Sequence, residues 1–322
     1  MDKRFDVVAL GELLIDFTAG GVSPQGNPVF EANPGGAPCN VLAMLRKLDK
    51  TCAFIGRVGD DMFGRQLKAV AESAGIDMSA LGMDRAVHTT LAFVKTDENG
   101  DRDFSFYRDP GADMMLTEDD LPPDTIRGAR IFHFGTLSMT HERVRAATKA
   151  AVKEAKEAGA LISFDPNLRP PLWKTLDEAK EQMLWGLGQA DIVKIADNEI
   201  EFLTGTADYD RGAAMLRERF PSIRLLNVTA GPGGSYAFFG SERVFVPGFL
   251  LGGTIETTGA GDTFCASVLN YVLEHGLNGL DREDLTQMLR FANAAAYLVT
   301  TKKGAIRSMP DPADVEAILA KH

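Results

Sequence analysis

Short apolar runs alternate with amphipathic stretches along most of the chain. The apolar runs are rich in β-branched and aromatic residues, which predicts strands at 5–11, 52–58, 129–135, 160–165, 191–196 and 223–229. The stretches between them have a helical period, which predicts helices at 38–48, 62–74, 141–158, 175–189 and 198–204. Strands separated by helices form βαβ units. The pattern therefore predicts an α/β fold, with a doubly wound, mainly parallel sheet covered by helices on both faces, in one domain over residues 1–322.

Two segments interrupt this alternation. Residues 13–34 are rich in Gly and Pro and have no helical period. Within residues 88–112, two alternating runs flank the dipeptide Asn99-Gly100, which is a strong hairpin signal. We expect both segments to contribute to a small antiparallel β-sheet lid inserted into the domain, because such flaps often close over ligands. A plain surface hairpin is the alternative.

Charge and composition narrow the classes of function. The formal net charge of -11 argues against a nucleic-acid partner, because binding phosphate backbones needs a concentrated basic surface. The apolar runs end well before the ~18 residues that a membrane span requires. The first residues lack the pattern of a signal peptide, and the three cysteines lack metal-ligand spacing. We therefore expect a cytoplasmic protein with no membrane partner.

The segment 256–276 carries the clearest candidate chemistry. Gly259, Ala260 and Gly261 directly precede an apolar helical run, and the free amides of a helix N-terminus bind anions. Asp262 follows at the same helix start. Phosphoryl transfer needs this combination of donors for the transferring group and a base for the acceptor hydroxyl. The structural alternative is a tight glycine turn with Asp262 as a helix cap.

A second glycine motif opens the helix predicted at 38–48. Gly35 and Gly36 precede Asn40 in this segment, and backbone amides together with a short amide side chain suit hydrogen bonds to a polyol. A Gly-Gly turn that merely caps a core helix is the alternative. P-loop, protein-kinase and dinucleotide-binding motifs are absent from the sequence, which excludes those nucleotide-binding classes.

The two motifs together resemble those of the ribokinase-like, or PfkB, family of carbohydrate kinases. That family has a GG-x-x-x-N element near the N-terminus and a D-T-x-G-A-G-D element near the C-terminus, and the resemblance covers nearly the whole chain. Within the family, the segments 11–17, 104–116, 163–173 and 196–205 are most similar to fructokinases. The resemblance implies transfer of the γ-phosphoryl group of ATP to a primary hydroxyl of a ketohexose, most simply fructose, with Mg²⁺.

The resemblance also implies catalytic and sugar-binding roles for residues of both motifs. Asp262 matches the general base that takes the proton of the attacking hydroxyl. The amides that match the anion hole belong to Gly259, Ala260 and Gly261. The residues that match sugar contacts are Asp16, Gly35, Gly36 and Asn40. An exposed acid at a strand edge is the alternative for Asp16.

Further residues match the nucleotide and metal sites of the family. Asn198 and Glu201 match an element that influences the magnesium and phosphate arrangement through water, although a helix cap and its box partner would explain the same pair. Thr229 and Gly231 match the nucleotide-binding loop. Asn293 matches a residue that lines the adenine pocket.

Two arginines and one histidine complete the set of candidates. Arg169 is the best cation for the phosphates, because a guanidinium offers oxyanions a rigid fork, and a structural ion pair is its alternative. Arg108, at the end of a lid strand, would either reach the sugar and its phosphate or serve the structure. His133 lies inside an apolar strand and is predicted to be a core histidine.

One departure from the family pattern concerns a monovalent cation. The C-terminal element usually begins with Asp, and this chain has Glu256. In relatives that Asp helps to bind the cation beside the anion hole, together with carbonyls and a Ser that Ser308 matches. Thr258 belongs to the same candidate site. Because Glu is one methylene longer, we expect activation by K⁺ to be retained but weakened.

Several alternatives remain open on the sequence. The acceptor could be 2-keto-3-deoxygluconate, ribose or a nucleoside, because specificity depends on a few lid and pocket contacts. A non-catalytic sensor of sugars or nucleotides is the alternative from another class, although it would have no chemical need for Asp262. An apolar outer face of the lid would allow a homodimer.

Overall fold

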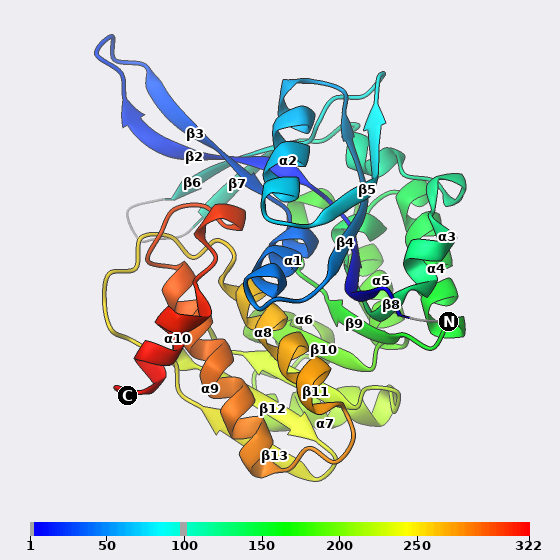
Figure 1. Cartoon of the computed structure of the whole chain (residues 1–322), viewed down its shortest axis with the longest axis vertical. Helices are drawn as coiled ribbons and strands as arrows, with labels where there is room; N and C mark the ends of the chain where they lie inside the picture. The colour runs from blue at the N-terminus through cyan, green and yellow to red at the C-terminus, as the bar shows by residue number, and fades with distance from the viewer. Residues whose placement is uncertain (1–2, 97–101) are drawn as a thin grey trace.

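A large, mostly parallel β-sheet forms the centre of the molecule (Figure 1). The computed structural model describes residues 3–96 and 102–322, and within them this sheet has nine strands in the order β13-β12-β11-β10-β9-β8-β1-β4-β5. β12 pairs antiparallel with β11 and β13, and the other neighbours are parallel. The strands are β1 (Phe5–Leu10), β4 (Cys52–Gly59), β5 (Asp77–Asp84), β8 (Ala129–Gly135), β9 (Leu161–Asp165), β10 (Ile192–Ala196), β11 (Leu225–Thr229), β12 (Ser235–Phe239) and β13 (Glu242–Val246).

Helices cover both faces of this sheet. One face packs against α1 (Ala37–Lys47), α2 (Met62–Ser73), α8 (Ala260–His275), α9 (Arg282–Val299) and α10 (Pro312–Leu319). The other packs against α3 (Pro123–Arg127), α4 (Glu142–Glu157), α5 (Leu176–Leu187), α6 (Asp197–Thr204) and α7 (Tyr209–Arg219). Successive strand residues point to opposite faces, so Val7 and Ala9 join the first core while Val8 and Leu10 join the second.

The α/β fold predicted from the sequence is confirmed. Each of the predicted strands and helices is present, with ends that differ by a few residues. The strands β5, β12 and β13 and the helices α3 and α7 were not predicted.

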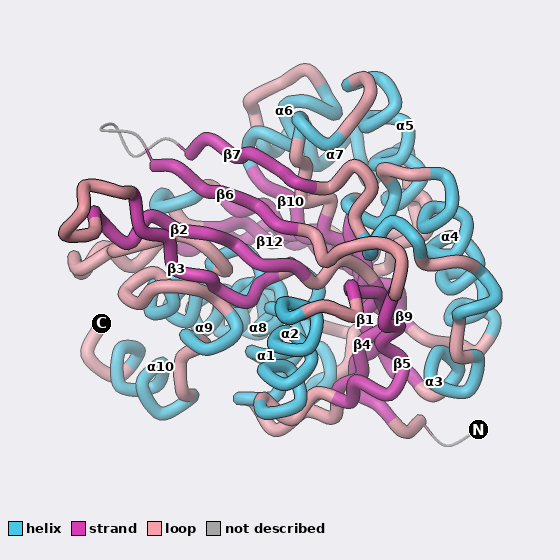
Figure 2. Tube along the Cα trace, turned by 90° about the horizontal axis from the view of Figure 1, so that it is seen from above, coloured by secondary structure: helices cyan, strands magenta, loops and turns pink. Residues whose placement is uncertain are grey.

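A second, smaller sheet lies across one end of the α/β body, as the view from above shows (Figure 2). Its order is β3 (Pro28–Gly35), β2 (Leu14–Val22), β6 (Leu91–Thr96) and β7 (Arg102–Tyr107). The β2–β3 and β6–β7 pairs are antiparallel, whereas β2 and β6 run parallel. Both segments that interrupt the alternation therefore contribute strands to one sheet. The predicted turn at Asn99-Gly100 lies outside the described residues.

The three cysteines and His133 are buried, and the cysteines all belong to the core that packs against α1 and α8. Cys39, Cys52 and Cys265 are buried and form no disulfide, and burial raises the pKa of Cys39 to about 12. His133 is 1% exposed and its Nδ1 lies 2.9 Å from the Ser163 hydroxyl, which confirms the predicted core histidine. Among residues 3–96 and 102–322, no helix has both the length and the apolar character needed to cross a membrane.

Candidate active site

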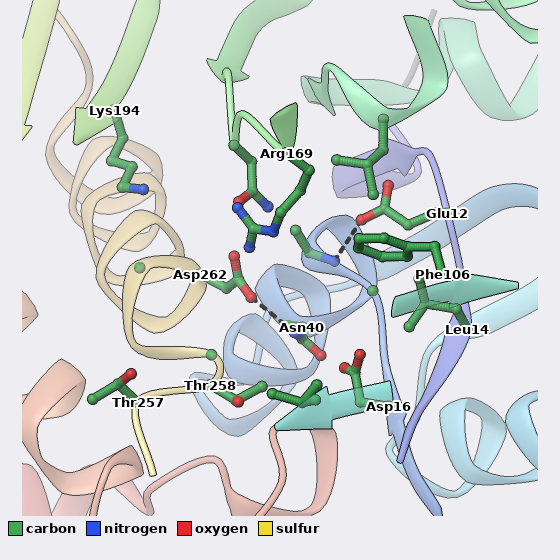
Figure 3. Close-up of a pocket in the computed structure, with 17 residues that line it drawn as sticks. Glu12, Leu14, Asp16, Asn40, Phe106, Arg169, Lys194, Thr257, Thr258 and Asp262 are labelled. Atoms are coloured by element: carbon green, nitrogen blue, oxygen red, sulfur yellow. Dashed lines mark hydrogen bonds between the residues drawn. The ribbon is translucent and has the colours of Figure 1, made fainter. Parts of the chain in front are cut away.

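A cavity of about 210 Å³ lies between the small sheet and the central sheet (Figure 3). Glu12, Leu137 and Asn167 line it and directly follow β1, β8 and β9, so the cavity opens at the carboxyl ends of the parallel strands. Ligands of open α/β sheets bind at this edge. The loops that follow β1, β8 and β9 therefore form a candidate binding site.

The small sheet contributes the wall of this cavity through alternate residues. Leu14 and Asp16 of β2 and Phe106 of β7 line the cavity. On the opposite face, Phe17 and Phe93 stack with ring centroids 4.8 Å apart. Because successive strand residues point to opposite faces, Asp16 faces the cavity while its neighbour Phe17 faces away from it.

The glycine pair before α1 brings the backbone close to the cavity. Gly36 has φ 125°, a conformation that favours glycine, and a side chain there would collide with the carbonyl of Glu12. Gly35 likewise leaves no room for a side chain beside the carboxylate of Asp16. Asn40, one turn into α1, is 3% exposed and lines the cavity. The predicted sugar contacts Asp16, Gly36 and Asn40 therefore lie together, with Gly35 behind them.

Asp262 is buried at the start of α8, facing the same cavity. The helix follows Gly259, whose φ of 80° is left-handed. Asn40 Nδ2 donates a hydrogen bond of 2.8 Å to Asp262 Oδ2. Burial raises the pKa of Asp262 to about 6, with Asp165 adding to the rise and the hydrogen bond from Asn40 opposing it. A carboxylate with this pKa is mostly ionised at pH 7. Because its pKa lies near that pH, it can accept a proton efficiently.

Two buried charged residues in this site were not predicted from the sequence. Lys194 on β10 lines the cavity, and its Nζ lies 3.1 Å from Asp165 Oδ2. Glu12 also lines it and accepts a hydrogen bond of 2.8 Å from the Ala37 amide, and burial raises the pKa of Glu12 to about 7. The sequence does mark Lys194, because it is a charged residue inside an apolar strand. A charge is rarely buried unless it is paired, so this position indicates a buried ion pair.

A second cavity of about 330 Å³ adjoins the first. Thr229, Gly231 and Asn293 line it, so the residues predicted for the nucleotide loop and the adenine pocket lie together. Asn293 Oδ1 accepts from the Ser235 hydroxyl at 2.8 Å, and its Nδ2 donates to the Val246 carbonyl at 3.1 Å. Asn293 therefore supports the wall of this cavity.

The two cavities meet at the glycine motif that precedes Asp262. Thr257 and Gly261 line both of them, Ala260 lines the second, and Thr258 and Gly259 line the first. The N-terminus of α8 thus stands between the two ligand spaces, where the amides of its first turn can bind an anion. The Ala260 amide donates to the Thr257 carbonyl at 3.3 Å in the structure and would exchange this bond for the anion.

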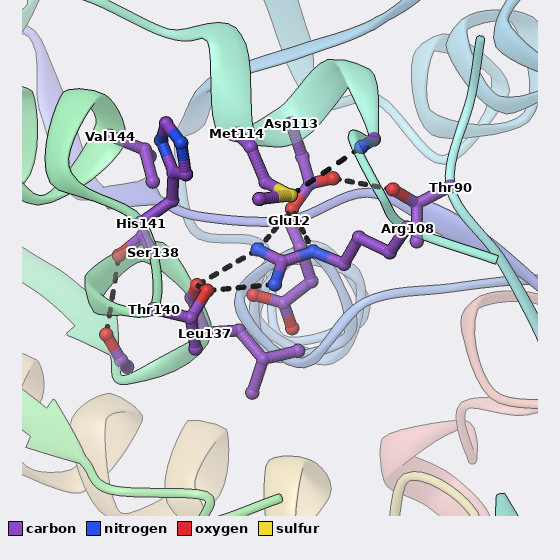
Figure 4. Close-up of polar contacts among 12 residues, drawn as sticks. Glu12, Thr90, Arg108, Asp113, Met114, Leu137, Ser138, Thr140, His141 and Val144 are labelled. Carbon is purple, nitrogen blue, oxygen red and sulfur yellow. Dashed lines mark hydrogen bonds and ion pairs between the residues drawn. The ribbon is translucent and has the colours of Figure 1, made fainter. Parts of the chain in front are cut away.

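Arg108 lies in a buried cluster of polar contacts. Its side chain is 3% exposed and forms an ion pair of 2.7 Å with Asp113 (Figure 4). It also donates to the Thr140 hydroxyl at 2.7 Å and to the Leu137 carbonyl at 3.0 Å. This cluster ties the end of β7 to the segment after β8, which gives Arg108 a structural role, and its contact with the sugar stays a prediction. Arg169, in contrast, lines the cavity.

Asn198 and Glu201 lie exposed on α6. The alternative reading of them as a cap and box partner is wrong, because α6 is capped at Ala196, whose amide donates to Glu199 Oε2 at 2.8 Å. Glu199 Oε1 accepts from the Leu168 amide at 2.7 Å. Glu199 therefore fills the capping role and leaves Asn198 and Glu201 at the surface.

Both carboxylate oxygens of Glu256 accept hydrogen bonds from other residues of the chain. Oε1 accepts from the Thr258 hydroxyl, and Oε2 accepts from the Gly304 amide at 3.2 Å. Ser308 donates its hydroxyl to the carbonyl of Lys303. The predicted cation residues therefore surround the loop 303–308, next to the glycine motif.

An α/β body with two cavities that meet at a helix N-terminus, beside a buried carboxylate, defines an enzyme of the small-molecule kinase class. Comparison with known families supports this class. The profile described as pfkB family carbohydrate kinase matches residues 4–312. The chain belongs to the PfkB family of carbohydrate kinases.

The chain is similar to curated fructokinases and to several solved structures of fructokinases. Fructokinase-1 of Zea mays is 42% identical over 98% of this chain and 98% of its own length. A fructokinase from Xylella fastidiosa with bound ATP has a TM-score of 0.89 at 30% identity, covering 98% of both chains. A fructokinase double mutant from Vibrio cholerae O395, with fructose, ADP and potassium ion bound, has a TM-score of 0.88 at 30% identity, covering 99% of both chains.

Proposed function

We propose that this chain is an ATP-dependent fructokinase, which transfers the γ-phosphoryl group to a primary hydroxyl of fructose. The observation that carries the proposal is the position of Asp262, buried at the junction of two adjoining cavities that share Thr257 and Gly261. We assign the cavity of about 210 Å³ to the sugar and the cavity of about 330 Å³ to the nucleotide. Similarity to fructokinases, one of them with fructose bound, supports fructose as the acceptor.

The sugar occupies the cavity under the small sheet. Asn40 Oδ1 is buried and accepts no hydrogen bond from the residues that the structure describes, so a ligand hydroxyl is its natural donor. Asp16 and the backbone at Gly35 and Gly36 supply further polar groups on the same side. These contacts orient one primary hydroxyl toward Asp262.

The transfer itself follows from this arrangement. The carboxylate of Asp262 accepts the hydroxyl proton as the sugar oxygen bonds to the γ-phosphorus. The bond between that phosphorus and the β–γ bridging oxygen breaks, and ADP leaves with its electron pair. The amides of Gly259, Ala260 and Gly261 stabilise the negative charge on the transferring group, since they stand at a helix N-terminus. Arg169 adds a positive charge to the same cavity.

The nucleotide occupies the second cavity, with Thr229 and Gly231 beside its phosphates and Asn293 in the wall of the base pocket. Among residues 3–96 and 102–322, no group of three or more His, Cys, Asp or Glu could hold a metal ion. Mg²⁺ fits this site as an ion carried by the phosphates, because it keeps several waters and takes few protein ligands. Asn198 and Glu201 are exposed on α6, and we propose that they contact such an ion through water.

We further propose that K⁺ binds beside the glycine motif and activates the enzyme weakly. Glu256, Thr258 and Ser308 supply oxygen atoms around the loop 303–308. The Glu256 carboxylate is already engaged by the Thr258 hydroxyl and the Gly304 amide. A cation must compete with these bonds, which weakens its binding.

The small sheet, from residues of about 13–34 and 88–112, acts as a lid on the single domain 1–322. Its closure over the sugar excludes water, which would otherwise compete as the acceptor. The outer face carries Phe30 and Tyr107, which are 42% and 65% exposed, and we propose that a second copy of the chain covers it. A cytoplasmic location belongs to this proposal, because the phosphoryl donor is ATP.

Measurement of ADP release tests the function. Fructose, 2-keto-3-deoxygluconate, ribose, glucose and adenosine are offered with Mg-ATP and K⁺. Fructose should be turned over far faster than the others. Turnover of another acceptor would keep the chemistry and refute fructose, whereas silence with all of them, together with measurable nucleotide binding, would favour the sensor.

A matched pair of variants assigns the base in the same assay. Asp262→Asn should abolish most of the turnover. Asp208→Asn makes the same change at the N-cap of α7, away from both cavities, where Asn also caps well, and should leave turnover unchanged.

A further inference from the structure

The buried ion pair between Lys194 and Asp165 has no assigned part in the reaction. The two side chains are 8% and 4% exposed, and Lys194 Nζ lies 3.1 Å and 3.3 Å from the two carboxylate oxygens of Asp165. A buried ion pair costs desolvation, and well-packed apolar residues of similar size often stabilise a fold as well or better. Lys194 also lines the sugar cavity, so the presence of this pair calls for a chemical reason.

Lys194 lies directly against the start of α8. A Cβ atom built on Gly261 would come within 3.0 Å of Lys194 Nζ, so the ammonium packs beside the backbone that directly precedes Asp262. Both residues line the same cavity, and Lys194 extends toward this helix start in Figure 3. At such range in a buried site, the charge of Lys194 favours the ionised form of Asp262, and the charge of Asp165 disfavours it.

The other groups around Lys194 leave its charge in place. His133 on β8 stays neutral, because burial and the charge of Lys194 lower its pKa to about 3. Burial raises the pKa of the Cys265 thiol on α8, so it too is neutral. Burial works against the charge of Lys194, but the carboxylates of Asp165, Glu199 and Asp262 raise its pKa above the ordinary value. Lys194 is therefore an ammonium throughout the neutral range.

The groups that face Asp262 come from several elements. Asn40 on α1 donates a hydrogen bond to it, and Arg169 after β9 contributes a second positive charge. Asp165 on β9 and Lys194 on β10 approach from the sheet below. Within this ion pair, Lys194 lowers the pKa of Asp262 and Asp165 raises it.

We propose that the Lys194–Asp165 pair is a positioning element that sets the pH at which Asp262 becomes ionised and able to act as the base. Lys194 favours the ionised carboxylate, and Asp165 both anchors Lys194 and keeps Asp262 from becoming too weak a base. This inference rests on the proposed function, because it concerns the base of that reaction. It holds for any sugar acceptor.

Two variants with opposite expected shifts test the proposal. Lys194→Gln keeps a hydrogen-bond donor for Asp165 and removes the positive charge, so the acid limb of kcat/KM should move up by about 1 pH unit, at the low end for a nearby opposite charge. Asp165→Asn removes the negative charge and should move the limb to lower pH. ATP also titrates, but its contribution to the acid limb is the same for the parent and both variants. The difference between their acid limbs is therefore free of it.

A control variant separates this role from a structural one. Arg57→Gln breaks another ion pair, with Asp84, and neither residue lines the cavity. It should lower the melting temperature and leave the acid limb in place. If Lys194→Gln behaves in the same way, with a lower rate at every pH and an unmoved limb, the proposal is overturned.

A direct titration keeps the test independent of turnover. The carboxyl ¹³C signal of Asp262 is assigned by its loss in Asp262→Asn and followed with pH in the parent and both variants. Opposite movements of its midpoint support the proposal even if no offered sugar is phosphorylated, a result that would refute the proposed function alone. Midpoints that coincide in all three proteins would refute the proposal. If Lys194→Gln fails to fold, an unmoved midpoint in Asp165→Asn refutes it equally.

Discussion

Replacing Asp262 by Asn should remove catalysis and stabilise the fold at the same time. The substitution keeps the size of the side chain, and its carbonyl oxygen can still accept the hydrogen bond that Asn40 donates to Asp262 Oδ2 at 2.8 Å. The proton acceptor is lost, so kcat should fall by about 10²–10⁴, the usual contribution of a general base.

The stability change follows from the pKa of Asp262. Burial raises it from 3.8 to about 6, so the ionised carboxylate is disfavoured in the folded protein. The unfolded chain loses this proton at lower pH than the folded protein, and stability therefore falls as pH rises from about 4 to about 6. At 1.36 kcal/mol per pH unit, a difference of about two units makes Asp262 cost about 3 kcal/mol above pH 6.

Asn carries no charge and escapes this cost. The free energy of unfolding of Asp262→Asn should exceed that of the parent protein by up to about 3 kcal/mol at pH 8 and by about half of that at pH 5. Urea unfolding at both pH values measures the difference, and ADP release at pH 8 measures kcat. Asp208→Asn, at an exposed helix cap, serves as the control for both measurements.

Two results would refute the reasoning. A variant that retains the turnover of the parent protein would remove Asp262 from the role of base. A variant that is inactive but less stable at pH 8 than at pH 5, relative to the parent, would mean that the carboxylate is not held at a cost in the folded protein.

Four further predictions follow from the site. Asp16→Ala should raise KM for the sugar with KM for ATP unchanged, as initial rates at varied sugar and ATP would reveal. Gly36→Ala should raise the same KM and lower the melting temperature, because its φ of 125° strains any side chain; an unaltered melting curve would contradict this. Glu256→Asp should strengthen activation by K⁺ relative to choline, since a shorter carboxylate competes less for internal bonds, and equal rates of the parent protein in both salts would rule out activation. Thiol reagents should modify none of the three buried cysteines in the native protein and all of them in urea, and rapid native labelling would disprove their burial.

The sequence pattern predicted the central fold well and its edges poorly. Central strands are buried on both faces and read as continuous apolar runs, which is why the strand FDVVAL of β1 was recognised. β5 has the sequence DMSALGMD, whose half-buried edge position leaves no clear run or alternation. α7 is short and strongly charged, so its apolar stripe is narrow.

The candidate site shows the same division. Motifs whose backbone must meet a ligand, such as the glycines before Asn40 and Asp262, were found because glycine and polar residues mark them in the sequence. Lys194 was missed because one sequence does not tell which face of β10 it occupies. The sequence left the role of Arg108 open, because its partner Asp113 stands in a segment whose fold the pattern did not predict.

A structure of the protein with fructose and a non-hydrolysable ATP analogue would test the central claim most directly. The account predicts fructose in the cavity lined by Asp16 and Asn40, with one primary hydroxyl within hydrogen-bond distance of Asp262 and in line with the γ-phosphorus at the start of α8. Fructose bound elsewhere, or with Asp262 out of reach of every hydroxyl, would contradict it.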